Sequence, residues 1–184
     1  MPHSLRLLFL LAFCFVFLPV SRASQQSGAS NAVVFPAIST YSLDKAKVNL
    51  PADFEGKVNL LLISFDSGQA KDLDTWMPAA LALQHMNFAF RYYKLPVSNP
   101  ENLIYRWWDN SSLRSVETDP ETWHWIVPLY TNKEIFLRSL NIANEKEVVA
   151  ALVDKSGHVL WKASGRITAD KKAALEAAVA SATR

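Results

Sequence analysis

The hydrophobic pattern of the first half of the chain predicts a β-α-β unit. Residues 58–65 (VNLLLISF) form an almost uninterrupted apolar run, which is typical of a strand buried on both faces at the centre of a sheet. A polar loop over 66–74 follows, and apolar residues then recur at helical spacing from Leu73 to Met86, with Pro78 early in the predicted helix. The alternating pattern over 88–96 predicts a second strand.

The stretch over 97–128 shows no sustained periodicity and is expected to be an irregular insert that is rich in aromatic residues. Within it, Asp119-Pro120-Glu121 predicts the start of a helix, because aspartate caps helices and proline is favoured in the first turn. After the insert, Thr131 and Glu134 fit a capping box at the start of a short helix over 134–140.

The end of the chain predicts a β-hairpin and a final helix. The turn sequence 154–157 (DKSG) separates two apolar segments, which predicts antiparallel strands over 148–153 and 158–163. A final helix is expected to be capped by Thr168 or Asp170, with Leu175, Ala178, Val179 and Ala182 on one face. The order of elements predicts an α/β domain that is a three-layer sandwich, with a central mixed sheet and helices on both faces.

The first 23 residues have the layout of a secretory signal peptide. A positively charged start precedes an apolar run over 7–20, and Ser21-Arg22-Ala23 supplies small residues before a cut after Ala23. As a helix the run would span about 21 Å, which is shorter than the ~30 Å hydrocarbon core, so we favour a cleaved signal over a membrane anchor. The expected organisation is a signal peptide over 1–23, a flexible lead-in over 24–32, and one domain over 33–184 in a secreted or periplasmic protein with no membrane span after cleavage.

Composition excludes several classes of function. Without Arg6 and Arg22, which lie in the predicted signal peptide, 17 basic residues stand against 17 acidic ones, so no nucleic-acid partner is expected. The histidines lack metal-ligand spacing and the five glycines form no phosphate-binding loop, so we expect no metal and no cofactor. Cys14 is the only cysteine of the 184-residue chain and lies in the predicted signal peptide, so the mature chain has no thiol.

Several segments resemble thioredoxin-like proteins. Residues 54–65 (FEGKVNLLLISF) resemble the first buried strand of peroxiredoxins and periplasmic thiol-disulfide oxidoreductases, and residues 152–161 (LVDKSGHVLW) resemble their C-terminal hairpin. Residues 129–165, particularly Asn141-Ile142-Ala143-Asn144, are more similar to the C-terminal block of the mitochondrial ATP-synthase assembly chaperone family. This resemblance spans Tyr41 to Val179 and implies a thioredoxin-like fold.

The resemblance also implies where a redox site would lie. Redox-active members of this fold carry a Cys-x-x-Cys pair at the start of the helix after the first buried strand, and a cis-proline before the third strand. Counted from Pro78, the two cysteine positions correspond to Ala70 and Leu73, and the proline position to Val148. Disulfide exchange and peroxide reduction both require a thiolate, so we expect these to be vestigial positions of a redox-inactive protein.

Two other sets of residues are candidate sites. Asp66, Asp72 and Asp74 crowd the loop where the cysteines would lie and could bind a cation or act as acid and base, although capping of a helix start explains them more simply. Large aromatic rings crowd the insert and the segment after it, and they serve either to pack the insert or to recognise a partner. The rings are Tyr105, Trp107, Trp108, Trp123, Trp125 and Tyr130. Trp123 and Trp125 lie two residues apart, so one of them is expected to be exposed.

Three hypotheses of function follow. The first is an exported, redox-inactive thioredoxin-like domain that binds a protein partner, or acts as an assembly factor, through the aromatic insert and the face around Ala70 and Leu73. The second is an enzyme with a non-thiol site on the loop from Asp66 to Asp74, or on His124. The third is a component of a redox pathway that relies on the cysteines of its partner.

Overall fold

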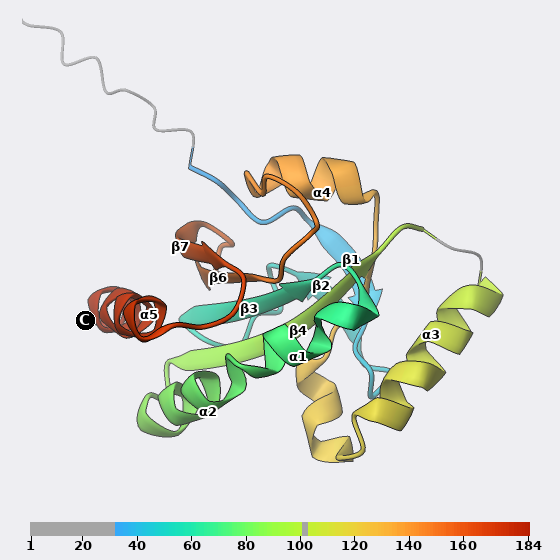
Figure 1. Cartoon of the computed structure of the whole chain (residues 1–184), viewed down its shortest axis with the longest axis horizontal. Coiled ribbons are helices and arrows are strands. Elements are labelled where there is room, and N and C mark those ends of the chain that lie inside the picture. The colour runs from blue at the N-terminus through green and yellow to red at the C-terminus, as the bar shows by residue number, and fades with distance from the viewer. Residues whose placement is uncertain (1–31, 101–102) are drawn as a thin grey trace, which may run out of the picture. The chain divides into compact units, whose positions relative to one another are not determined.

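The computed structural model describes residues 32–100 and 103–184, and only the backbone of residues 103–109. The predicted signal peptide and all of the lead-in except Ala32 lie outside the described residues. The elements, shown in Figure 1, are β1 (Ile38–Tyr41), β2 (Lys47–Leu50), β3 (Val58–Ser64), the 3-10 helix η1 (Ser67–Gln69), α1 (Ala70–Asp74), α2 (Met77–Met86), β4 (Phe90–Ser98), α3 (Leu103–Val116), the 3-10 helix η2 (Pro120–Trp125), β5 (Leu129–Tyr130), α4 (Lys133–Ser139), β6 (Val149–Asp154), β7 (Val159–Ser164) and α5 (Ala169–Ala182).

β3 occupies the centre of a five-stranded mixed sheet with the strand order β5-β4-β3-β6-β7. It runs parallel to β4 and antiparallel to β6. All residues of β3 except Ser64 are buried, which confirms the prediction of a central strand covered on both faces. β1 and β2 pair separately as an antiparallel hairpin that the sequence did not predict, because four-residue strands of mixed polarity carry too little pattern.

Alternate residues of β3 enter two hydrophobic clusters on opposite faces of the sheet. Leu61 and Ile63 belong to a cluster that includes Phe136 of α4. Leu60 and Leu62 belong to a second cluster, which also contains residues of α1, α2 and α5 and Trp76, the residue before α2. The helical residues are Leu73 of α1, Ala80 and Leu83 of α2, and Leu175 and Val179 of α5. Figure 1 shows α4 on one side of the sheet and α2 and α5 on the other. The predicted three layers, with helices on both faces, are therefore confirmed.

The helix expected from Leu73 to Met86 is divided into α1 and α2. The N–H of Trp76 donates to the carbonyl of Leu73 at 3.0 Å, the tighter spacing of a 3-10 turn. Pro78 has no N–H to give to residue 74, so a continuous α-helix would lose a hydrogen bond at this point. The break turns Trp76 into the core, where it is 1% exposed and its indole N–H donates to the carbonyl of Gly165 at 3.0 Å.

The predicted start of β4 and the predicted N-cap of α4 are wrong by two residues and one residue. β4 begins at Phe90, and Phe88 is 91% exposed, because the side chain of Asn87 accepts the N–H of Ala89 and forms a turn there. The N-cap of α4 is Asn132 and not Thr131, since the side chain of Asn132 accepts the N–H of Ile135 at 3.0 Å. Local side-chain acceptors decide both boundaries.

The stretch over 97–128, predicted to be irregular, is largely helical. It contains α3 and η2. The helix start at Asp119 is confirmed, as a 3-10 helix, because its side chain accepts the N–H of Glu121 at 3.0 Å. Helix α3 was missed because its central residues, Asp109-Asn110-Ser111-Ser112, have low helix propensity.

The C-terminal hairpin and α5 are confirmed, although both strands of the hairpin begin one residue later than predicted. The carboxylate of Asp154 accepts the N–H groups of Ser156 and His158, and Gly157 adopts a φ of 88° that favours glycine. Thr168 is the residue that caps α5, with its side chain accepting the N–H of Lys171 at 3.3 Å. Among residues 32–100 and 103–184, no helix has the length and apolar composition needed to cross a membrane.

Candidate functional site

A pocket of about 250 Å³ opens where the parallel strands β3 and β4 end. One wall comes from the β3–α1 connection and α1, and the other from the insert, through the end of α3 and Ile126. The apolar lining includes Leu73, Val97, Leu113, Val116 and Ile126, and the polar lining includes Asp66, Asp74, Lys94 and Glu117. The carboxyl ends of parallel strands are where α/β folds bind ligands, so we take this pocket as the candidate site.

The pocket joins two regions that the sequence analysis singled out separately. Ala70 and Leu73 both line it; Ala70 is exposed and Leu73 is 6% exposed. Asp66 also lines it, and its carboxylate accepts the N–H of Gly68 at 2.7 Å. Asp66 therefore caps the start of η1, the helix-capping role that was the simpler of the two interpretations of this residue. Val148 is 2% exposed and packs in the same cluster as Leu73, but it is not part of the pocket lining.

Gln69 and Lys133 connect the segment between β3 and α1 to the segment before β6. The side chain of Gln69 accepts the N–H of Phe65 at 2.8 Å and donates to the carbonyl of Glu145 at 2.8 Å. The ammonium of Lys133 donates to the carbonyl of Phe65 at 2.8 Å and lies 3.1 Å from the carboxylate of Glu145. The connection from β3 to α1 is therefore held in place by polar contacts and not by a disulfide.

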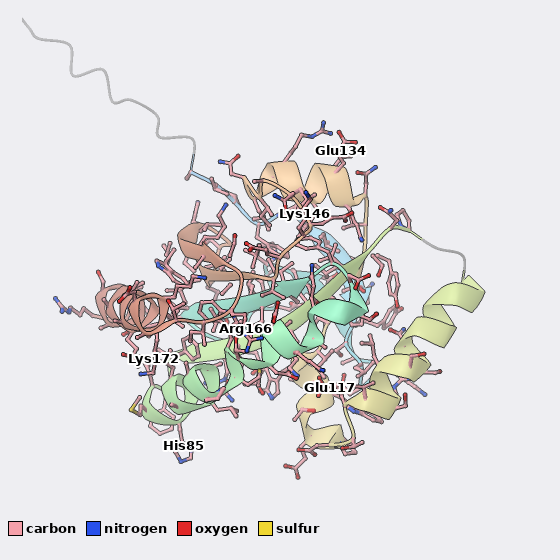
Figure 2. The ribbon with its side chains drawn as sticks, in the orientation of Figure 1. His85, Glu117, Glu134, Lys146, Arg166 and Lys172 are labelled. Carbon is pink, nitrogen blue, oxygen red and sulfur yellow. The ribbon has the colours of Figure 1, made fainter. Side chains whose placement is uncertain are left out.

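Lys94 anchors the insert to the sheet at the edge of the pocket. Its Nζ lies 2.5 Å from Oε1 of Glu117 and 3.6 Å from Oδ1 of Asp74, and its side chain is 13% exposed. Burial raises the pKa of the neighbouring Tyr92, and the charges of Glu117 and Asp119 raise it further, so its hydroxyl stays protonated. Figure 2 shows Glu117 beside α3.

Of the three aspartates proposed as an alternative catalytic site, Asp66 and Asp74 line the pocket and Asp72 does not. Asp66 caps η1, Asp72 pairs with Arg166 at 2.7 Å, and Asp74 faces Lys94. Within the described part of the chain, no three histidine, cysteine or acidic side chains are grouped so that they could hold a metal ion.

The aromatic residues of the insert pack against their surroundings where their side chains are described. The indole N–H of Trp123 donates to the carbonyl of Glu117 at 2.7 Å, and the guanidinium of Arg114 lies 5.5 Å from the centre of its ring. Trp125 packs edge-on against Tyr93 at 5.6 Å between ring centres. Both tryptophans are half-buried, so the expected exposure of one of them is not observed. The side chains of Tyr105, Trp107 and Trp108 lie outside the described residues.

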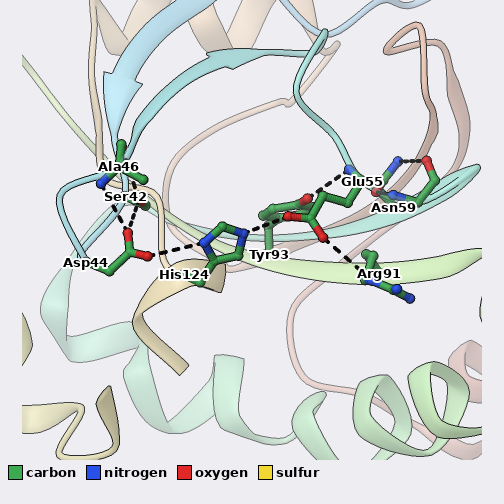
Figure 3. Close-up of polar contacts among 9 residues, drawn as sticks. Ser42, Asp44, Ala46, Glu55, Asn59, Arg91, Tyr93 and His124 are labelled. Carbon is green, nitrogen blue, oxygen red and sulfur yellow. Dashed lines mark hydrogen bonds and ion pairs between the residues drawn. The ribbon is translucent and has the colours of Figure 1, made fainter. Parts of the chain in front are cut away.

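His124 bridges two carboxylates from different parts of the chain, as Figure 3 shows. Its Nδ1 lies 3.2 Å from the carboxylate of Asp44, and its Nε2 lies 2.7 Å from that of Glu55. The hydrogen bond with Glu55 raises the pKa of His124 against the effect of burial, and Asp44 adds to the increase. The backbone N–H of Glu55 donates to the hydroxyl of Tyr93, whose pKa burial raises to about 12. The network joins η2 to the β1–β2 turn and to the segment before β3.

Four residues that line the pocket were not predicted from the sequence: Lys94, Leu113, Val116 and Glu117. Lys94 carried a detectable signal, because a lysine interrupts an otherwise largely apolar strand. The other three belong to the end of α3 and the residue after it, and a helix had not been expected there.

Comparison with known proteins supports the fold. No family model and no curated protein matches the sequence. Among solved structures, a protein assigned as the thiol:disulfide interchange protein DsbE of Chlorobium tepidum matches with a TM-score of 0.56 and 16% identity, over 82% of this chain and 96% of the other. BsSco, of the Sco family of cytochrome c oxidase assembly proteins, gives a TM-score of 0.59 at 17% identity, over 83% and 95%. The exposed lipoprotein thioredoxin Etrx1 of Streptococcus pneumoniae gives 0.55 at 12%, over 79% and 99%.

These matches confirm that the fold is thioredoxin-like. At such low identity they establish the fold and no shared activity. The similarity of residues 129–165 to the mitochondrial ATP-synthase assembly chaperones stays a prediction.

Proposed function

We propose that this protein is an exported, redox-inactive, thioredoxin-like binding or assembly factor that holds an apolar segment of a protein partner in the pocket between α1 and α3. The observation that carries the proposal is the composition of the pocket walls. One wall holds Ala70 and Leu73, where redox relatives would carry cysteines, and the other is formed by the insert. The only cysteine is Cys14, so the domain over 33–184 has no sulfur nucleophile.

The chemistry of the pocket favours a protein segment as its ligand. Its walls are largely apolar, and its volume of about 250 Å³ lies below the roughly 300–1,000 Å³ of sites that enclose a whole small molecule. It therefore suits one or two apolar side chains that project from a larger partner. Val116, at the rim, is 73% exposed and is available to such a partner.

An assembly role rests on the proteins that share the fold. BsSco belongs to a family of cytochrome c oxidase assembly proteins, and its structure covers most of this chain. A domain of this fold can thus serve assembly, and we propose that the partner here is a protein under assembly outside the cytoplasm. Export itself is supported by the sequence of residues 1–23.

Site-specific photocrosslinking tests the proposal. A benzophenone amino acid is placed at Val116, on the pocket rim, or at Ile135, which is 57% exposed on α4 and is not part of the pocket lining. Each purified mature protein is illuminated with the envelope or secreted fraction of its source, and adducts are identified by mass spectrometry. We expect a discrete adduct from position 116 that Leu113→Asp abolishes, and no such adduct from position 135. Identical adducts from both positions, or an adduct insensitive to Leu113→Asp in a folded variant, would overturn the proposal.

A further inference from the structure

A second exposed apolar surface lies at the C-terminal end of α2, away from the pocket between α1 and α3. Eight large apolar side chains are exposed in residues 32–100 and 110–184, and three of them fall within 81–88. Leu81 is 50% exposed, Met86 is 72% exposed and Phe88 is 91% exposed. Large contiguous apolar patches on a folded domain mark interaction surfaces.

Leu81 and Phe88 line an open groove of about 570 Å³. Its lining includes Leu81, Gln84, His85, Phe88, Arg91 and Trp125. The groove thus runs from α2 across the start of β4 to the end of η2. Figure 2 shows His85 at the outer edge of α2, pointing away from the sheet. Tryptophan, phenylalanine and arginine, which all line this groove, are enriched in protein interfaces.

The polar groups of the groove favour an acidic ligand. No aspartate or glutamate lines it. Arg91 is held in place through its Nη1, which donates to the carbonyls of Phe88 and Phe90, while its Nη2 has no partner among the described side chains and carbonyls. The nearest counter-charge, Glu55, lies 4.0 Å from Nε of Arg91 and also accepts from His124, so the guanidinium is only partly neutralised.

Gln84 provides a second polar feature. Its Oε1 is buried and has no hydrogen-bond partner in the described part of the chain. An unsatisfied buried acceptor costs about 1–3 kcal/mol, and an N–H group of a ligand in the groove would remove that cost after a small shift of the side chain.

We propose that this groove binds an acidic, apolar segment of a protein partner. Apolar side chains of the segment pack against Leu81, Phe88 and Trp125, and a carboxylate pairs with Nη2 of Arg91. The pocket between α1 and α3 has the opposite character, since Asp66, Asp74 and Glu117 outnumber Lys94 in its lining. The groove is therefore a separate site, and the proposal does not depend on what the pocket binds.

Two fluorescein-labelled amphipathic peptides test the proposal. They share length and leucine spacing, and one carries glutamates where the other carries lysines. Fluorescence anisotropy with the mature protein should give a dissociation constant about tenfold lower for the glutamate peptide. Phe88→Ala should weaken its binding about tenfold without unfolding the protein, because Phe88 is almost fully exposed. Ile135→Ala, at a matched exposed position on α4, should leave binding unchanged.

The pairing of a peptide carboxylate with Arg91 is tested separately with Arg91→Gln. This variant should bind the two peptides with equal affinity. In the unmodified protein, addition of the glutamate peptide should change the amide chemical shifts of residues 81–91 and 125. Equal affinity for the two peptides, full binding by Phe88→Ala, or shifts confined to the pocket between α1 and α3 would each overturn the proposal.

Discussion

The ammonium of Lys94 on β4 lies 2.5 Å from the carboxylate of Glu117, which follows α3. This contact fastens the insert to the sheet at the edge of the pocket, and the side chains of Lys94 and Glu117 are 13% and 26% exposed. Because the pair is largely withdrawn from water, it should matter more than a surface ion pair. Lys94 also lies 3.6 Å from Asp74 of α1, so this one side chain contacts both walls that we propose to bind a partner.

Lys94→Met should lower the free energy of unfolding by about 1–3 kcal/mol, because it leaves the carboxylate of Glu117 with its partner removed. Urea denaturation followed by circular dichroism measures the change. The additional substitution Glu117→Gln should recover part of the loss. Lys172→Met, which breaks the exposed pair with Glu176 on α5, should change stability by less than about 0.5 kcal/mol. Equal effects at the two lysines would contradict the anchoring role.

His124 should make stability depend on pH. The hydrogen bond with Glu55 raises the pKa of His124 above its ordinary value of 6.5, so its contribution is complete below pH 6.5 and is lost as the pH rises through the raised pKa. For Asp44, burial acts to raise the pKa, but hydrogen bonds from Ser42, Ala46 and His124 lower it below the ordinary value of 3.8. The contribution of Asp44 to stability is therefore complete above pH 3.8 and is lost as the pH falls through the lowered pKa.

His124→Gln should therefore destabilise the protein more at pH 5.5 than at pH 8.5. Urea denaturation at the two pH values measures the difference. In a background that carries Glu55→Gln, the same substitution should show a much smaller dependence on pH. A constant loss of stability across this range would show that the bridge carries no proton-linked stabilisation.

Gly56 should tolerate no side chain. A Cβ there would lie 2.4 Å from the carbonyl of Val58 and 2.8 Å from Oδ1 of Asn59, which is fully buried and bonded to both backbone groups of Gly56. Gly56→Ala should cost about 1–3 kcal/mol in thermal or urea unfolding. Gly68→Ala should cost less, since the added atom would meet only the movable carboxylate of Asp66. The reverse order would contradict the packing described for this turn.

Ala70→Cys combined with Leu73→Cys should introduce disulfide-reductase activity. The two positions lie three residues apart in the first turn of α1, beside the pocket. Insulin reduction should rise above that of the unmodified protein, and Ala70→Cys alone should not turn over, because the mixed disulfide would lack a resolving thiol. An inactive but folded double variant would show that the assignment of these positions is wrong.

Export predicts a defined mature chain. The protein recovered from the envelope or medium of its source should begin at Ser24, which intact mass and N-terminal sequencing measure directly. Recovery of a chain that still carries Cys14 would contradict cleavage after Ala23.

The sequence predicted the parts of the fold that depend on local pattern. The run over 58–65 identified the central strand, and the turn at Asp154 and the cap at Thr168 were recognised from residue types that favour those conformations. Helix α3 was missed because polar residues of low helix propensity interrupt it.

The candidate site was predicted in part. Ala70 and Leu73, which were identified from a family resemblance, and Asp66, which was identified from the polar loop after the buried strand, all line the pocket. Lys94 and Glu117 lie 23 residues apart in the sequence, and α3, which was not predicted, lies between them. No local pattern encodes their pairing. The bridge from Asp44 through His124 to Glu55 likewise depends on the tertiary fold.

We propose that this thioredoxin-like domain binds a partner and carries out no thiol chemistry. The most direct measurement is turnover by the purified mature protein in insulin reduction and in thiol-dependent peroxide reduction. Because Ala70 and Leu73 supply no thiolate, both rates should equal those of buffer with the same reductant. Turnover above that background, proportional to the concentration of the mature protein and without any added thiol protein, would contradict the claim.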